Sequence, residues 1–302
     1  MNDAGGPASR GGVTARSDHA ADRIDRDAYE PLPVDVISIQ SQVLYGCVGN
    51  SAAVPTLQGM GLNVVAVPTV LLSNVPHYDT LHGGPIPTEW FAGFLADLER
   101  RNALRHVRAI LLGYLGPPEQ TAELVEWLER ILDEHPGLML IVDPVMGDHD
   151  AGVYVHHDLP PVLRDRLVPL ARGLAPNAFE LEQLVGEPLP TRDATVAAAR
   201  TLLTGTTEWV VVTSAAPAQT PSGTVTVLVV TRDAVEEIGH ELVTTIARGT
   251  GDLFTAVLTG GLLHGLSLVD ATRAACDHTV TVLKRTAALG CGELVLDVGP
   301  VR

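Results

Sequence analysis

The segment at residues 246–254, IARGTGDLF, places an aspartate directly behind a Gly-Thr-Gly turn and ahead of a long apolar stretch. Gly249 and Gly251 allow a tight turn with converging backbone N–H groups, and a helix beginning near Gly251 adds the positive end of its dipole. Such a turn suits the charge that develops on a phosphoryl group in transfer. Asp252 could accept the proton of the attacking hydroxyl. An aspartate in a first helical turn is also common as plain dipole stabilisation, so the segment alone leaves both interpretations open.

Predicted strands and helices alternate from residue 34 onwards. Strands are expected at 34–40, 62–70, 107–113, 138–143, 172–177 and 208–214. Helices are expected at 50–60, at 88–101 with a Thr88 cap, at 118–135 and at 191–203. A further helix is expected to follow the strand at 172–177 and to end at residue 185. A hairpin is expected at 224–242, and two helices close the chain.

This alternation predicts an α/β protein with three layers, α/β/α, around a mostly parallel central sheet. Residues 31–302 are expected to form a single domain of this kind. Residues 1–30 are rich in Gly, Ala, Asp and Arg without apolar periodicity, and we expect them to be a disordered tail.

The residues that follow the predicted strands should meet at one edge of the sheet, where ligands of such folds bind. They are polar, rich in acids and almost devoid of cations: Ser41, Gln42, Ser73, Asn74, Tyr114, Asp143, Asp148, Asn177, Glu180, Thr213, Ser214 and Asp252. Several carboxylates facing one cleft repel one another unless a metal or a proton joins them. Asp143, Asp148 and Glu180 therefore predict a Mg²⁺ site, and Mg²⁺ usually arrives with phosphate oxygens.

Composition excludes several other classes of protein. The formal net charge of −16 argues against binding to nucleic acid or to an anionic membrane, and no apolar run is long enough to span a bilayer. Lys284 is the only lysine, so the chain has no P-loop and no lysine near a glycine-rich turn for a Schiff base. Three cysteines without metal-ligand spacing fit a reducing, cytoplasmic setting.

Some of these residues also have purely structural interpretations. Asn177 and Glu180 stand where a capping box would place them. Tyr114 could be an ordinary half-buried tyrosine, and Ser41 could merely cap a turn. Cys47 is conceivable as a nucleophile, but a small packed residue is the simpler interpretation.

Several motifs, taken together, carry a resemblance to a known family. GTGD opens a late helix, and the N-x-x-E sequence of NAFE (177–180) lies upstream of it, as in the ribokinase-like kinases. Within that superfamily the chain resembles pyridoxal kinases over residues 34–290. The matching segments are ISIQSQVLYGCVGNSAA (37–53), LLSNVPHY (71–78), LLGYLG (111–116), DPVMGD (143–148) and LAPNAFELEQL (174–184).

The resemblance implies transfer of the ATP γ-phosphoryl group to the 5′-hydroxyl of pyridoxal, giving pyridoxal 5′-phosphate in vitamin B6 salvage. Pyridoxine and pyridoxamine are further candidate acceptors. It implies Asp252 as the catalytic base, with the backbone of Gly249, Thr250 and Gly251 as the anion hole. The implied contacts of the vitamer ring are Ser41, Val48, Leu72, His77 and Tyr114. The implied contacts of ATP are Asp143, Ala175, Asn177, Glu180, Thr213 and Ser214. Mg²⁺, K⁺, a homodimer and a cytoplasmic location are implied as well.

One segment departs from the family pattern. Where the family commonly has Ser-Asn-His, this chain has Ser73-Asn74-Val75, followed by Pro76 and His77. His77 could compensate, or it could be a simple loop histidine. We expect residues 77–87 to form a mobile flap over the ring.

Three other functions are weighed against this one. A hydroxymethylpyrimidine kinase of the same superfamily shares DPVM and N-x-x-E, but it typically carries cysteine where this chain has Asp252. A dinucleotide-dependent oxidoreductase is not favoured, because the first strand is not followed by G-x-G-x-x-G. A non-catalytic B6-binding protein on the same fold remains possible from the sequence.

Overall fold

The computed structural model describes residues 29–296 of the chain. The predicted tail, residues 1–30, lies outside the described residues except for its last two positions. Among the described residues, no helix is both long and apolar enough to cross a membrane.

A nine-stranded sheet forms the centre of the fold, with the order β11-β10-β9-β8-β5-β4-β1-β2-β3. Its strands are β1 (Val36–Tyr45), β2 (Val64–Asn74), β3 (Gly83–Pro85), β4 (Ala109–Leu112), β5 (Met139–Val142), β8 (Gly173–Leu174), β9 (Trp209–Val212), β10 (Thr224–Thr231) and β11 (Val235–Glu241). The six strands from β9 to β2 are parallel, whereas β3, β10 and β11 are antiparallel to their neighbours. The mostly parallel sheet predicted from the sequence is confirmed.

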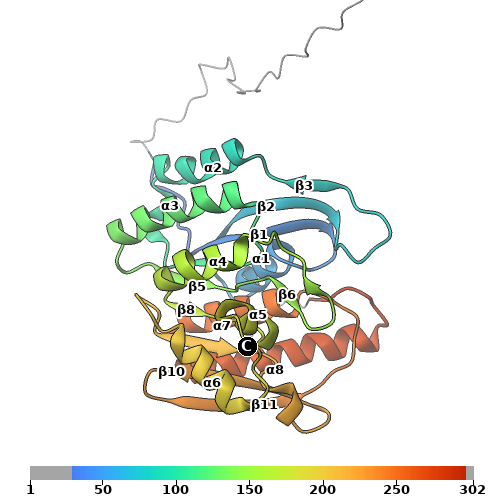
Figure 1. The fold of residues 1–302 in the computed structure, drawn as a ribbon. Helices are drawn as coiled ribbons and strands as arrows, with labels where there is room; N and C mark the ends of the chain where they lie inside the picture. The colour runs from blue at the N-terminus through green and yellow to red at the C-terminus, as the bar shows by residue number, and fades with distance from the viewer. Residues whose placement is uncertain (1–28, 297–302) are drawn as a thin grey trace, which may run out of the picture.

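Helices cover both faces of this sheet, so that the fold has three layers (Figure 1). They are α1 (Asn50–Gly59), α2 (Thr88–Arg100), α3 (Pro118–Glu134), α4 (Leu159–Val162), α5 (Ala178–Val185), α6 (Arg192–Thr201), α7 (Thr250–Leu263) and α8 (Leu268–Ala288). Short helical turns lie at Ala103–His106, Leu163–Leu167, Val168–Leu170 and Pro217–Gln219. A small hairpin of β6 (Gly147–Asp148) and β7 (Gly152–Val153) follows β5.

Alternate side chains of the parallel strands supply two separate cores. In β4, Ile110 and Leu112 pack with the layer of α2, α3, α5 and α6, whereas Leu111 packs with α1, α7 and α8. Both faces of a parallel sheet are buried, which explains why the strands appear in the sequence as continuous apolar runs.

Two local expectations need correction. Thr88 does not cap α2: it is the first helical residue, and Pro87 holds the cap position at a φ of −52° and a ψ of 133°, without a side-chain hydrogen bond. Strands β1 and β2 run past their predicted ends, to Tyr45 and Asn74, because they pair with each other over this extra length. The extended part of β2 also pairs with β3, through Leu71 and Leu72 (Figure 1).

Candidate active site

The Gly-Thr-Gly turn forms the N-terminus of α7. Gly249 holds the cap position at a φ of 93°, and a Cβ there would lie 1.9 Å from the carbonyl oxygen of Cys47. Only glycine fits such a conformation at such an approach. The turn therefore rests directly against the loop between β1 and α1.

Asp252 lies in the first turn of α7 and is half-buried. Burial raises the pKa of its carboxyl from 3.8 to about 6, although the backbone N–H groups of Gly49 and of Asp252 itself lower it. A carboxyl with this pKa is largely ionised at neutral pH and is still basic enough to accept a proton.

Asp143 lies under the same helix end. It follows β5 directly, is 5% exposed, and its Oδ2 accepts a hydrogen bond of 2.8 Å from the Thr255 hydroxyl in α7. A Cβ on Gly251 would lie 3.4 Å from the same oxygen. Burial raises the pKa of Asp143 well above its ordinary value, and the charges of Glu180 and Asp252 raise it further.

Asn177 and Glu180 form the capping box that the sequence left open. The backbone N–H of Glu180 donates to Asn177 Oδ1 over 2.8 Å, and Glu180 Oε2 accepts from the backbone N–H of Asn177 over 2.8 Å. Glu180 Oε1 also accepts from the backbone N–H of Met146 over 3.1 Å. Burial raises the pKa of Glu180 from 4.5 to about 8 in spite of these donors. The structural interpretation is thus correct, and the capping box also fixes Glu180 as a buried acid near Asp143 and Asp252.

Tyr154, just after β7, is a member of this cluster that the sequence reasoning missed. Partial burial raises the pKa of its hydroxyl, and the charges of four carboxylates raise it further: Glu180, Asp143, Asp252 and Asp148. The four predicted acids thus lie within electrostatic range of one phenol. No motif points to Tyr154, because its neighbours in the fold are distant in sequence.

Asp148 is engaged differently from the other acids. Its Oδ1 accepts from the backbone N–H groups of Asp150 and Ala151, and its Oδ2 pairs with Arg248 over 2.9 Å. Arg248 directly precedes the Gly-Thr-Gly turn, so a guanidinium group borders the acidic cluster. The sequence reasoning assigned Arg248 no role.

The residues predicted to contact ATP lie at the ends of β8 and β9. Ala175 is buried, and its N–H donates to Val142 of β5. Thr213 forms a bridge with Asn177, which places it beside the capping box, and Ser214 follows with a φ of 50°. The predicted nucleotide contacts therefore lie together next to Glu180.

The residues predicted to contact the ring lie on the other side of the Gly-Thr-Gly turn. Ser41 is buried at an irregularity of β1, against Gly49. Val48 is half-buried, and its Cα would lie 3.3 Å from a Cβ on Gly249. Leu72 pairs with Val43 in the extension of β2. Tyr114 follows β4 and is half-buried, which raises the pKa of its hydroxyl.

The departing segment closes into a loop that its own side chains hold. Asn74 Nδ2 donates to the carbonyl oxygens of Val75 and Thr80, and Ser73 Oγ accepts from the N–H of His82. Val75 is 4% exposed and packs inward, whereas His77 lies in the exposed part of the loop.

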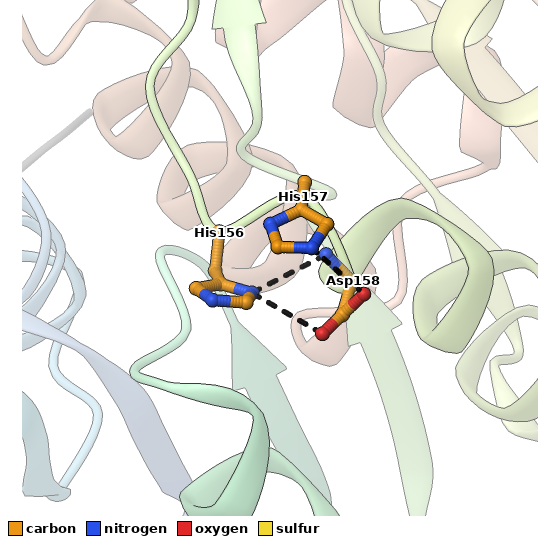
Figure 2. Close-up of side chains that lie close together, drawn as sticks. All are labelled: His156, His157 and Asp158. Carbon is orange, nitrogen blue, oxygen red and sulfur yellow. Dashed lines mark hydrogen bonds and ion pairs between the residues drawn. The ribbon is translucent and has the colours of Figure 1, made fainter.

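A separate group of possible metal ligands lies at His156, His157 and Asp158 (Figure 2). All three residues are exposed and consecutive, and the two imidazole rings stack. His156 Nδ1 already accepts from the backbone N–H of Asp158, and both rings are within ion-pair distance of the Asp158 carboxylate. The geometry is that of a local turn, so the buried acids are the better candidates for a metal centre.

Several known proteins are similar to this chain in sequence or in structure. A family model described as phosphomethylpyrimidine kinase matches residues 92–297. The pyridoxine/pyridoxal/pyridoxamine kinase of Bordetella bronchiseptica is 54% identical over 275 residues, which cover 91% of this chain and 97% of that protein. The pyridoxal kinase PdxY of Corynebacterium diphtheriae is 32% identical, over 87% of this chain and 93% of its own.

Among solved structures, the chain is similar to the pyridoxal kinase of Leishmania donovani in complex with ADP and pyridoxine. The TM-score is 0.78 at 26% identity, and the match covers 88% of this chain and 91% of the other.

Proposed function

This chain belongs to the pyridoxal kinase family, and on that premise we propose that it transfers the γ-phosphoryl group of ATP to the 5′-hydroxyl of pyridoxal. Pyridoxine and pyridoxamine are proposed as further acceptors, since the Bordetella relative is named for all three. The observation that carries the proposal is the half-buried Asp252 behind the Gly249 turn, beside two buried carboxyl groups.

In the proposed reaction, the Asp252 carboxylate accepts the proton of the 5′-hydroxyl as its oxygen attacks the γ-phosphorus. The bond between the γ-phosphorus and the bridging oxygen of ADP breaks, and ADP leaves with that electron pair. The backbone N–H groups of Gly249, Thr250 and Gly251 face the charge that spreads over the transferring group. The dipole of α7 acts in the same direction.

Asp143 and Glu180 fit a Mg²⁺ ion. Burial raises the pKa values of both carboxyl groups. The charge of Asp252 raises both pKa values further, and the charge of Glu180 also raises that of Asp143, so a bound divalent cation would relieve the repulsion. When bound, Mg²⁺ neutralises the phosphate charge of ATP. Asp148 stays a predicted ligand that would have to exchange its ion pair with Arg248 for the metal.

Nucleotide contacts are proposed at the ends of β8 and β9, through Ala175, Asn177, Thr213 and Ser214. Their placement beside Glu180 supports this assignment. Arg248 is proposed as an additional contact for the phosphates, because a guanidinium group suits an anionic ligand.

The ring of the vitamer is proposed to lie between apolar side chains on the other side of the turn. Val48, Leu72 and Tyr114 would cover its faces, while Ser41 and His77 would bind its polar substituents. Apolar walls suit a flat aromatic ligand in polarity.

K⁺ dependence, a homodimer and a cytoplasmic location are proposed from the resemblance. Comparing turnover in K⁺ and Na⁺ buffers tests the first of these. Light scattering after gel filtration tests the second, and cell fractionation tests the third.

The experiment that tests the function offers pyridoxal, pyridoxine and hydroxymethylpyrimidine side by side, each with ATP, Mg²⁺ and K⁺. We expect phosphorylation of the two B6 vitamers and little of the pyrimidine. Turnover of the pyrimidine alone would instead support a kinase of thiamine synthesis. Tight binding of vitamers without any turnover would support a non-catalytic binding protein.

A further inference from the structure

Glu293 carries a buried carboxylate without a partner of good hydrogen-bond geometry among the described residues. It lies after α8, its side chain is 12% exposed, and both of its oxygens are shielded from solvent. A buried carboxylate is costly unless nearby groups compensate its charge. Its surroundings should therefore show which group it serves.

The closest cationic or donor groups belong to the loop after β2. His77 Nε2 lies 3.4 Å from Glu293 Oε1. The carboxylate also raises the pKa of the neighbouring Tyr78 hydroxyl to about 12, first through an interaction of hydrogen-bond type. The ring centroids of His77 and Tyr78 lie 4.4 Å apart, so the carboxylate faces two adjacent aromatic rings.

The loop between β1 and α1 leaves room for this carboxylate. Gly46 has a φ of 111°, and a Cβ there would lie 2.7 Å from Glu293 Oε2 and 2.6 Å from Val75 Cγ2. A side chain at position 46 would thus displace both the carboxylate and the start of the loop. The glycine, the carboxylate and the loop form one packed unit.

This unit joins three segments that are distant in sequence. Ser73 and Asn74 close the loop on itself, but their hydrogen bonds reach only its ends at Val75, Thr80 and His82. Within the described part of the chain, Glu293 is the charged residue from another segment that contacts the middle of the loop, and it does so at His77.

We propose that Glu293 is a positioning residue, which orients the His77 imidazole toward the ring of the vitamer. With Nε2–H directed at the carboxylate, a neutral imidazole keeps Nδ1 as the acceptor for a hydroxyl on the ring, because a partner on one nitrogen selects the tautomer. The inference rests on the proposed function and deepens it, since it concerns how the same site recognises a hydroxylated pyridine.

The first test is steady-state kinetics of Glu293→Gln, which keeps the shape and removes the charge. We expect the KM for pyridoxal to rise about tenfold, which is typical when the interaction between two contacting residues is lost. The values of kcat and of the KM for ATP should stay within about twofold of the wild type. Glu241→Gln removes a charge from an exposed ion pair with Lys284 and is the matched control, expected to change nothing.

A double-mutant cycle shows whether Glu293 acts through His77. In a His77→Asn background, Glu293→Gln should no longer change the KM for pyridoxal. An equal effect in both backgrounds, or an equal rise of both KM values, would overturn the proposal. If Glu293→Gln does not fold, Glu293→Asp retracts the charge by one methylene and should give the same selective rise.

The closing measurement does not depend on turnover. The ¹⁵N resonances of His77, identified by their loss in His77→Asn, should show Nε2 protonated in the wild type and a changed tautomer balance in Glu293→Gln. Unchanged resonances would overturn the proposal even in an active kinase. Changed resonances in a protein that phosphorylates no vitamer would sustain the contact and reject the proposed function.

Discussion

The acidic cluster and the loop after β2 lie on opposite sides of the Gly249 turn and are built in different ways. Backbone N–H groups and the Thr255 hydroxyl hold the buried carboxyl groups of Glu180 and Asp143. The loop at residues 73–82 is mostly exposed, and a few side-chain contacts hold it. Phosphoryl transfer needs fixed charges on rigid elements, whereas a site that admits an organic substrate needs a segment that can move.

Glu180→Gln should produce the largest change of the ATP side. The glutamine oxygen can still accept from the Asn177 N–H, so the capping box is retained, whereas the ionisable carboxyl group and the acceptor for the Met146 N–H are lost. We expect the KM for ATP·Mg²⁺ to rise about 10- to 100-fold, which is the usual loss of metal affinity when a residue that supports the metal is replaced. Initial rates at varied ATP measure it.

The control for this variant is Glu187→Gln, an exposed change just beyond the same helix. If Glu180→Gln raised only the KM for pyridoxal, the division of the site into two regions would be wrong.

The stability of the nucleotide-free protein should fall as the pH rises, because of the same residue. The pKa of Glu180 is about 8 in the folded chain, against an ordinary value of 4.5 for a glutamate in the unfolded chain. Between these two pH values the folded state therefore keeps a proton that the unfolded chain has lost. Its contribution is present below about pH 4.5 and is lost as the pH rises through about 8. The wild-type Tm should therefore drop more between pH 5 and pH 8 than the Tm of Glu180→Gln. Parallel Tm curves by calorimetry would contradict this assignment.

Asn74→Ala should give a smaller change, confined to the vitamer side. It removes the hydrogen bonds from Nδ2 to Val75 and Thr80, each with a net contribution of about 1 kcal/mol. We expect the KM for pyridoxal to rise about 3- to 10-fold, with the KM for ATP unchanged. Asn63→Ala, at an exposed position before β2, is the control. Equal effects on both substrates would show that the loop also supports the nucleotide side.

Lys284→Gln should have the smallest effect of all. The lysine pairs with Glu241 over 2.8 Å, but both side chains are 54% exposed, and such pairs contribute little. Activity should be unchanged, and the free energy of unfolding should change by about 0.5 kcal/mol at most. A loss of activity would contradict the exclusion of lysine chemistry.

The two regions also differ in how far the sequence predicts them. Asn177 and Glu180 are three residues apart, and Gly249 and Asp252 belong to one turn, so local patterns reveal their geometry. The strands were found from their apolar runs, because burial on both faces leaves a clear signal.

The remaining features depend on contacts between segments that are distant in sequence. The extension of β1 and β2 arises from their mutual pairing, and Asp148 meets Arg248 across 100 residues. Glu293 reaches His77 from the opposite end of the chain. No periodicity or short motif encodes such contacts. The prediction that Thr88 caps α2 was wrong for a local reason, because Pro87 occupies the cap position and the helix begins at Thr88.

The most direct test of the account is Asp252→Asn, assayed for both turnover and binding. We expect kcat for pyridoxal to fall about 10²- to 10⁴-fold, the usual contribution of a general base, while pyridoxal and ATP bind within about twofold of the wild type. Asp270→Asn makes the same change in the first turn of the neighbouring helix α8 and should leave kcat unaltered. A variant that keeps wild-type kcat would contradict Asp252 as the base and leave it a helix-stabilising residue.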